Sequence, residues 1–267
     1  MIPNVLTIAG TDPSGGAGIQ ADLKTFSALG VYGMSVVTAL VAQTTTGVHE
    51  VMYVPAEFVT TQLEVLFADV RVDAVKIGML ANADVIRVVA DCLHRYRPAY
   101  VVLDPVMVAK SGDTLLEPAA VESLVGELMP AVDLVTPNLD EAAVMLGEPV
   151  VTAARDMPGQ AERVAALGAK RVLLKGGHLA DAESTDILLS EEGVEVLRAP
   201  RIATDNDHGT GCTLSAAIAA LRPSSEDWRH AVVEAKDYLT GALAAADQLD
   251  VGRGHGPVHH FYRLWVS

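Results

Sequence analysis

Short runs of Val, Ile and Leu alternate along the chain with longer stretches whose apolar residues recur every three or four positions. Such runs are typical of strands buried on both faces of a sheet, and the longer stretches are typical of amphipathic helices. The predicted strands are Val5–Ala9, Ser35–Val41, Val75–Ile77, Tyr100–Leu103, Val132–Val135 and Arg171–Leu174, with a hairpin of Thr185–Leu189 and Val194–Leu197. The predicted helices are one through Ile19, Leu23 and Phe26, then Ala56–Phe67, Asp84–Tyr96, Pro118–Leu128, one from near Asn138, Gly211–Leu221 and Trp228–Ala246. This order predicts an α/β fold, in which a mostly parallel sheet is covered by helices on both faces.

The composition limits the kinds of protein that the chain can be. Its 267 residues contain no Pro/Ser-rich linker, low-complexity tract or internal repeat, so we expect a single domain over residues 1–267. A net charge of −15 argues against nucleic acid or an anionic membrane as a partner. Cys92 and Cys212 cannot make a disulfide framework, and neither a signal peptide nor a long apolar segment is visible. We therefore expect a cytoplasmic protein without a membrane span.

Glycines and polar residues gather where the predicted strands end. In open α/β sheets ligands bind beyond the carboxyl ends of the strands, so a cleft is expected along one edge of the sheet. The segments at these ends are Gly10–Gly18, Gly78–Met79, Asp104–Val106, Asn138–Glu141 and Lys175–His178.

The segment His208–Thr213 places two glycines directly before a helix. Backbone N–H groups and the helix dipole favour an anion there, although the same glycines could form a turn without a ligand. Cys212 falls in the first turn of this helix, where we expect the pKa of its thiol to be lowered. Cys92 shares an apolar helical face and is expected to be a small buried residue.

Three further features each allow two interpretations. The Gly10–Gly18 turn, followed by Asp22, could bring backbone and a carboxylate to a ligand, or could simply be a tight turn. Asn138 and Glu141 have the spacing of a capping box, and could alternatively organise Mg²⁺ near phosphates. Lys175 could meet a phosphate or be an exposed residue at a strand end. The pair His259 and His260 has no second cluster at ligand spacing, so no metal is assigned to it.

Taken together, these residues resemble those of the hydroxymethylpyrimidine/phosphomethylpyrimidine kinases. The resemblance extends over essentially the whole chain. Its segments are Leu6–Asp22, Ala42–Gln43, Lys76–Met79, Asp104–Met107, Thr136–Asn138, Lys175–His178, His208–Ala217 and Gly254–Phe261.

The resemblance implies a ribokinase-like fold, the cofactors ATP and Mg²⁺, and a homodimer. It implies conversion of 4-amino-5-hydroxymethyl-2-methylpyrimidine to its phosphate and then to its diphosphate, on the route to thiamine diphosphate. The residues that it assigns to the pyrimidine are Gly10, Asp22, Gln43, Met79 and Val106. It assigns ATP binding to Asn138, Lys175 and Thr210, and Mg²⁺ binding to Asp104 and Glu141. The residues that it assigns to catalysis at the transferring phosphoryl group are Gly209, Gly211, Cys212 and, again, Lys175.

Two positions depart from the pattern of this family, and two other functions stay open. Thr44 stands where Asn is expected, and Asp207 stands where Thr is expected. Asp207 adds negative charge beside the phosphate site, which should weaken ATP binding slightly. A pyridoxal kinase on the same fold is the nearest alternative, and a pyrimidine sensor without catalytic activity is the other.

Overall fold

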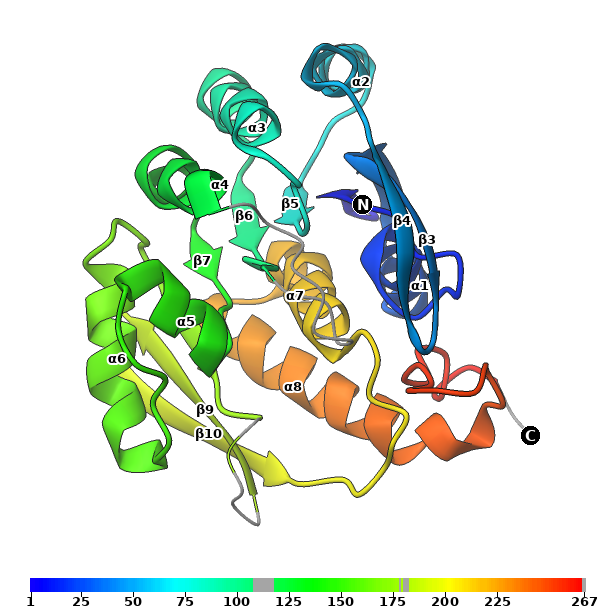
Figure 1. The fold of residues 1–267 in the computed structure, drawn as a ribbon, viewed down its shortest axis with the longest axis vertical. Helices are drawn as coiled ribbons and strands as arrows, with labels where there is room; N and C mark the ends of the chain where they lie inside the picture. Colours follow the sequence, from blue (N-terminus) through cyan, green and yellow to red (C-terminus); the bar gives the residue numbers. More distant parts are fainter. Residues whose placement is uncertain (108–117, 178, 180–182, 266–267) are drawn as a thin grey trace.

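An eight-stranded sheet forms the centre of the computed structural model, which describes residues 1–107, 118–177, 179 and 183–265 (Figure 1). The strands are β1 (Asn4–Ala9), β2 (Tyr32–Val37), β5 (Ala74–Ile77), β6 (Tyr100–Leu103), β7 (Leu134–Val135), β8 (Val172–Lys175), β9 (Glu183–Ser190) and β10 (Gly193–Pro200). Their order across the sheet is β10-β9-β8-β7-β6-β5-β1-β2, and neighbours are parallel except that β9 runs antiparallel to both β8 and β10.

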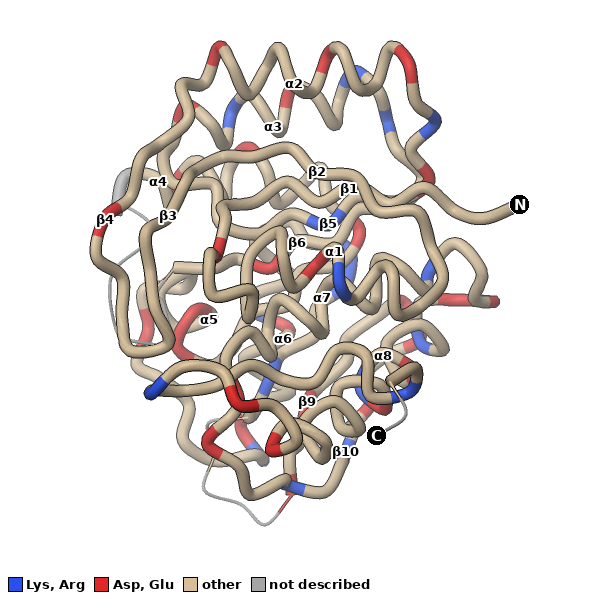
Figure 2. Tube along the Cα trace, turned by 90° about the vertical axis from the view of Figure 1, so that its right-hand side faces the viewer, with Lys and Arg blue, Asp and Glu red and all other residues tan. Residues whose placement is uncertain are grey.

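Helices cover both faces of this sheet. One face carries α1 (Gly18–Ala28), α7 (Thr210–Leu221) and α8 (Trp228–Ala244). The other carries α2 (Ala56–Asp69), α3 (Ala83–Tyr96), α4 (Pro118–Ser123), α5 (Leu139–Leu146) and α6 (Met157–Ala165). On β6, Val101 and Leu103 enter the second core and Val102 the first, as expected for a strand buried on both sides. Figure 2 shows the layers from the side, with α2 and α3 above β1, β2 and β5, and α1 and α7 below these strands. The predicted α/β architecture is therefore confirmed.

The strand predicted at Ser35–Val41 is wrong in one respect, because the chain leaves the sheet in the middle of it. β2 ends at Val37, and β3 (Ala39–Thr44) pairs with β4 (Gly47–Tyr53) in a separate antiparallel hairpin. Thr38 lies at the break and is fully buried. Its N–H donates to Ala9 O (3.0 Å) and its hydroxyl donates to Met79 O (2.7 Å), so the chain is anchored where it turns out of the sheet.

Several helix boundaries also differ from the sequence-based expectation. The helix predicted over Pro118–Leu128 is α-helical to Ser123 and continues as a π-helical turn and a 3₁₀ turn that contains Pro130, which has no N–H to continue an α-helix. Neither α6 nor β4 was predicted, and the last helix ends at Ala244 rather than Ala246. Among the described residues, no helix is long and apolar enough to cross a membrane.

The turn of the β3–β4 hairpin is held by a segment near the C-terminus, which lies below it in Figure 1. The N–H groups of Arg253 and Gly254 donate to Thr45 Oγ1 (3.1 and 3.0 Å), and that of His255 donates to Thr45 O (3.1 Å). A Cβ atom on Gly252 would lie 2.2 Å from Thr45 Oγ1, and one on Gly254 would lie 2.2 Å from Thr45 O. The fit therefore depends on two glycines.

Candidate active site

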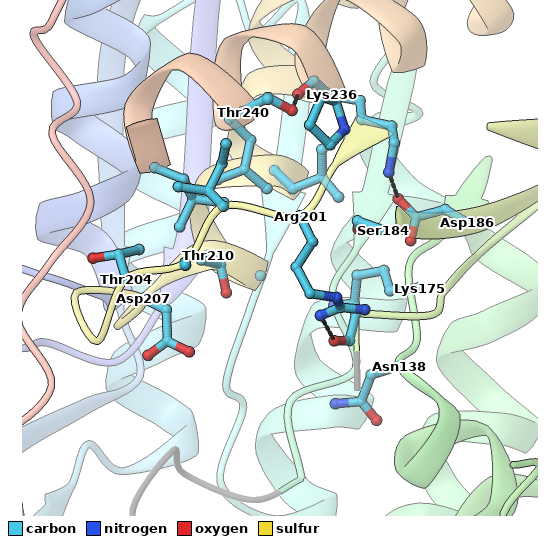
Figure 3. Close-up of a pocket in the computed structure, with 18 of the residues that line it drawn as sticks. Asn138, Lys175, Ser184, Asp186, Arg201, Thr204, Asp207, Thr210, Lys236 and Thr240 are labelled. Atoms are coloured by element: carbon cyan, nitrogen blue, oxygen red, sulfur yellow. Dashed lines mark hydrogen bonds and ion pairs between the residues drawn. The ribbon is translucent and has the colours of Figure 1, made fainter. Parts of the chain in front are cut away.

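Two adjoining cavities lie at the carboxyl edge of the parallel strands. The larger cavity, of about 880 Å³, is bordered by the ends of β8 to β10, the segment 200–207, α7 and α8 (Figure 3). The smaller cavity, of about 570 Å³, is bordered by the Gly10–Gly18 turn, β3, the ends of β5 and β6, α5 and α7. The residues that line both are Asn138, Lys175, Asp207, Thr210 and Gly211. A ligand in one cavity can therefore meet a ligand in the other at the beginning of α7.

The Gly10–Gly18 turn is organised by Asp12, which the sequence analysis did not single out. Asp12 Oδ1 accepts the N–H of Ser14 (2.8 Å), and Oδ2 accepts the N–H groups of Gly16 (3.1 Å) and Ala17 (2.8 Å). His208 Nε2 lies 2.8 Å from the same Oδ2. Burial opposes ionisation, but the hydrogen bonds, led by that of His208, hold the pKa of Asp12 well below its ordinary value. The missed signal was an Asp two residues before a Ser in a glycine-rich turn, which is typical of an Asx turn.

Glycines bring the beginning of α7 against both the turn and the strand ends. Gly209 is the N-cap at φ +79°, and a Cβ on it would lie 1.7 Å from Gly16 O. A Cβ on Gly211 would lie 3.3 Å from Lys175 Nζ and 3.5 Å from Asp104 Oδ2. The first N–H groups of a helix have no partner inside it, so these glycines leave room for a ligand that accepts from them.

Lys175 is mostly buried and forms an ion pair with the buried Asp104, so the alternative of an exposed strand-end lysine is wrong. Lys175 Nζ lies 2.8 Å from Asp104 Oδ1, which also accepts the hydroxyl of Thr136 (3.2 Å). Burial alone would raise the pKa of Asp104, but Lys175 lowers it below its ordinary value. Burial alone would lower the pKa of Lys175, but Asp104 and then Glu141 raise it. Both groups are therefore charged at neutral pH.

Asn138 and Glu141 form the predicted capping box at the beginning of α5. Asn138 Oδ1 accepts the N–H of Glu141 (2.8 Å), and Glu141 Oε2 accepts the N–H of Asn138 (2.7 Å). Burial raises the pKa of Glu141 to about 7, although Lys175 acts against this shift. A carboxylate that caps a helix keeps further lone pairs with which it can bind a metal ion. The metal interpretation of Glu141 therefore stays a prediction. The described residues contain no group of three or more His, Cys, Asp and Glu side chains suited to a metal ion.

Cys212 lines the smaller cavity in the first turn of α7, but its expected low pKa is wrong. Burial raises the pKa of the thiol to about 11, and the nearby ammonium of Lys76 only reduces the shift. Removal from water therefore outweighs the effect of the helix N-terminus on this pKa. Cys92 is buried as expected, and burial raises its pKa to about 12.

Four of the five residues predicted to bind the pyrimidine line the smaller cavity, and Asp22 does not. The four are Gly10, Gln43, Met79 and Val106. The side chain of Asp22 points from α1 toward the sheet and is fully buried. Asp22 Oδ2 accepts from Thr7 Oγ1 (2.6 Å) and Lys76 Nζ (2.9 Å). Because Lys76 itself lines the cavity, the prediction for Asp22 is corrected to a position behind the cavity wall.

Asp207, one of the two departures, lies on the wall between the cavities. His255 Nδ1 is 3.1 Å from Asp207 Oδ1. The other departure, Thr44, is exposed in the hairpin, and its hydroxyl lies 2.8 Å from that of Thr46. His178 of the predicted Lys175–His178 segment lies outside the described residues.

The ammonium of Lys175 and the N–H groups at the beginning of α7 lie where the two cavities meet, and an α/β protein with this arrangement is suited to act as a phosphotransferase. The comparisons with known proteins make this assignment narrower. The chain belongs to the phosphomethylpyrimidine kinase family, whose sequence pattern matches residues 12–259. The hydroxymethylpyrimidine/phosphomethylpyrimidine kinase of Escherichia coli K12 is 58% identical over 262 residues, which are 98% of each chain.

Two further relatives add to this result. A thiamine biosynthesis bifunctional protein of Geobacter sulfurreducens is 48% identical over 257 residues, which are 96% of this chain and 52% of that one. Among solved structures, the pyridoxal kinase from Staphylococcus aureus in complex with AMP-PCP has a TM-score of 0.90 and 33% identity, and covers 99% of this chain and 95% of that one. The predicted ribokinase-like fold is therefore confirmed.

Proposed function

We propose that this kinase transfers the γ-phosphoryl group of ATP to the hydroxymethyl group of 4-amino-5-hydroxymethyl-2-methylpyrimidine, and then to the resulting monophosphate. The observation that carries the proposal is the wall of five residues shared by the two cavities. ATP occupies the larger cavity with its phosphates at this wall, and the pyrimidine occupies the smaller cavity. The products serve thiamine diphosphate synthesis, which the relatives named for thiamine biosynthesis support.

The residues at the shared wall suit phosphoryl transfer, in which catalysis is mostly positioning and charge stabilisation. The ammonium of Lys175 and the N–H groups at the start of α7 bind the negative oxygens of the phosphoryl group as it moves. The hydroxyl of the pyrimidine must lose its proton as it attacks phosphorus. The thiolate form of Cys212 is the group to which we assign this proton, and Asp12 and His208 hold the two glycine-rich segments together around the reacting groups.

Asp104 and Glu141 are the residues that would hold Mg²⁺. Mg²⁺ usually keeps several waters and binds one or two carboxylates together with phosphate oxygens, so these two carboxylates, which line the smaller cavity beside the shared wall, fit this ion. When bound, Mg²⁺ neutralises charge on the phosphates. Lys175, which we assign to the nucleotide phosphates, also lies next to the two residues assigned to Mg²⁺. It is paired with Asp104 and interacts with Glu141.

Replacement of Glu141 by Gln distinguishes the role of this side chain in capping α5 from its proposed role in binding Mg²⁺. Gln can still complete a capping box, so we expect the thermal unfolding temperature to change little while kcat falls and extra Mg²⁺ partly restores it. Because the pKa of Glu141 is raised to about 7, its negative charge increases as pH rises from 6 to 8. The apparent affinity for Mg²⁺ should therefore rise over this range in the native enzyme and not in Glu141→Gln. An unchanged kcat at all Mg²⁺ concentrations would leave Glu141 with the cap alone.

Gln43 should recognise the pyrimidine ring, since an amide offers both a donor and an acceptor to its edge. Gln43→Leu leaves that edge unpaired, at a cost of about 1–3 kcal/mol, or roughly 5- to 150-fold in KM for the pyrimidine. KM for ATP should stay nearly the same, because Gln43 lines only the smaller cavity. Steady-state kinetics with each substrate varied in turn measures this difference. Equal increases in both KM values would contradict the assignment.

Pyridoxal is a second candidate substrate, because a pyridoxal kinase superimposes over 99% of the chain. An assay of ADP release with the pyrimidine, and separately with pyridoxal, tests both functions. We expect kcat/KM to be higher for the pyrimidine. Turnover of pyridoxal alone would replace the proposed function, and binding of the pyrimidine without ADP release would favour the sensor.

We also propose that the chain is a single domain and that it assembles as a homodimer. The mass of the protein in solution will test the homodimer.

A further inference from the structure

We infer that Asp186 and Lys236 form a positioning pair, which fixes the strand end that carries Lys175 at the wall between the two cavities. The inference rests on the proposed function, since it assigns Lys175 to the phosphates of ATP. Both side chains line the larger cavity and neither lines the smaller one, and Figure 3 shows them paired with each other. They come from β9 and α8, respectively.

The first part of the argument is the hydrogen bond that ends β8. Lys175 is the last residue of β8 and is opposite Asp186 in the β8–β9 register. The next N–H group, that of Gly176, donates to the side chain of Asp186 (N to Oδ1, 3.0 Å). A Cβ on Gly176 would lie 2.2 Å from Thr185 O, so this backbone packs directly against β9. The carboxylate thus sets the direction in which the chain leaves the sheet after Lys175.

The second part is the burial of the pair. Asp186 is 5% exposed and Lys236 is 8% exposed, and Lys236 Nζ lies 2.5 Å from Asp186 Oδ2. A carboxylate without a partner is costly to bury, so Lys236 compensates the buried carboxylate of Asp186 and holds it in place. The carboxylate of Asp186 on β9 is therefore bonded both to Lys236 on α8 and to Gly176, the residue after Lys175.

The third part is the other end of the same segment. Arg201 Nη1 donates to Gly177 O (2.8 Å), and its Nη2 donates to Leu179 O (2.7 Å). Asp186 therefore holds an N–H group and Arg201 holds carbonyl groups of the segment that follows Lys175. Lys175 Nζ has a defined position beside Asp104. A small shift of the backbone that follows Lys175 would move the ammonium from this position and misplace it relative to a phosphate.

The test compares two double variants that both lack the buried charges, so neither leaves an unpaired ion. Asp186→Asn/Lys236→Met keeps an oxygen that can accept from Gly176, whereas Asp186→Leu/Lys236→Met does not. We expect the Leu variant to bind AMP-PCP about tenfold more weakly than the Asn variant, with a similar rise in KM for ATP. KM for the pyrimidine should differ by less than about twofold, as expected for an effect limited to the nucleotide side.

The control is the pair of Asp133 and Lys170 at the amino ends of the parallel strands, which makes the same two kinds of bond but is less buried, with the Lys170 side chain 56% exposed. Asp133 Oδ1 is 2.7 Å from Lys170 Nζ, and Asp133 Oδ2 accepts the N–H of Val101 (2.9 Å). Asp133→Asn/Lys170→Met and Asp133→Leu/Lys170→Met remove the same interactions far from the cavities. These two variants should differ in thermal stability and bind AMP-PCP equally.

Three results would overturn the inference. Native-like affinity for AMP-PCP in both Asp186 double variants would mean that the bond to Gly176 does not position Lys175. The same loss of affinity in both would mean that Lys236 contacts the nucleotide directly. A matching rise in KM for the pyrimidine would mean general loosening of the fold.

Two further measurements complete the design. If the Leu variant does not fold, hydrogen exchange in the native enzyme decides, since the Gly176 amide should be protected without nucleotide and rapid exchange would refute the inference. Lys175→Met is assayed in parallel. If it binds AMP-PCP normally, the proposed role of Lys175 fails, whatever the Asp186 variants do.

Discussion

Replacement of Cys212 by Ala should slow phosphorylation of the pyrimidine alcohol by about 10²–10⁴-fold, the usual contribution of a general base. Phosphorylation of the monophosphate should be slowed far less. Its nucleophile is a phosphate oxygen that is largely ionised at neutral pH, since the second pKa is about 6. Both steps keep the backbone N–H groups of α7, which an Ala side chain does not remove. Separate assays of the variant on the alcohol and on the monophosphate, at saturating ATP and Mg²⁺, measure the difference.

The raised pKa of Cys212 gives the same hypothesis a dependence on pH. With a pKa of about 11, the thiolate is a small fraction at pH 7 and grows about tenfold for each pH unit below that value. The alcohol step should therefore accelerate with pH in the native enzyme and not in Cys212→Ala, and the phosphate step should respond less in both. Equal losses on the two substrates and parallel pH profiles would show that Cys212 positions the phosphoryl group and accepts no proton.

Replacement of Lys175 by Met should lower kcat by about 10²–10³-fold, as found when a donor to developing negative charge is removed. It should also lower the free energy of unfolding by about 3–5 kcal/mol, because it leaves the carboxylate of Asp104 buried without its partner. Activity assays and denaturant unfolding measure the two effects. Lys175→Met/Asp104→Asn removes both charges, so it should recover much of the stability and none of the activity.

The stability effect has a defined dependence on pH. In the native protein Lys175 holds the pKa of Asp104 below its ordinary value, so this pair stabilises the fold above pH about 4. That stabilisation is lost as pH falls through the lowered pKa. The difference in stability between the native protein and Lys175→Met should therefore be largest near neutral pH and shrink in acid. A difference that does not vary with pH would mean that the lysine stem, rather than its charge, stabilises the fold.

The sequence predicted the sheet and the strand-end residues because both follow from local patterns. Apolar runs such as Tyr100–Leu103 identify buried strands, and parallel strands bring their carboxyl ends to one edge. The β3–β4 hairpin was not predicted, because Thr38 turns the chain out of the sheet through contacts with Ala9 and Met79, which are distant in sequence. Propensity carries no information about such contacts.

The errors at the site have a similar origin. The first turn of a helix predicts a lowered thiol pKa, but burial depends on the tertiary structure and determines the result at Cys212. The position of Asp22 behind the wall depends on Lys76, a partner from another strand. Both errors concern how deeply a side chain lies, which a motif does not specify.

The contact between Thr45 and the C-terminal segment should leave a record in the sequences of related enzymes. A side chain at position 252 has no room while a threonine occupies position 45, since a Cβ there would lie 2.2 Å from Thr45 Oγ1. A Cβ at position 254 would instead lie 2.2 Å from the backbone oxygen of residue 45, which is present with any residue at that position. Position 45, in the turn of the hairpin that carries Gln43, precedes both glycines by more than two hundred residues. Positions 45 and 252 should therefore covary when many family members are aligned, whereas position 254 should stay glycine whatever residue stands at 45.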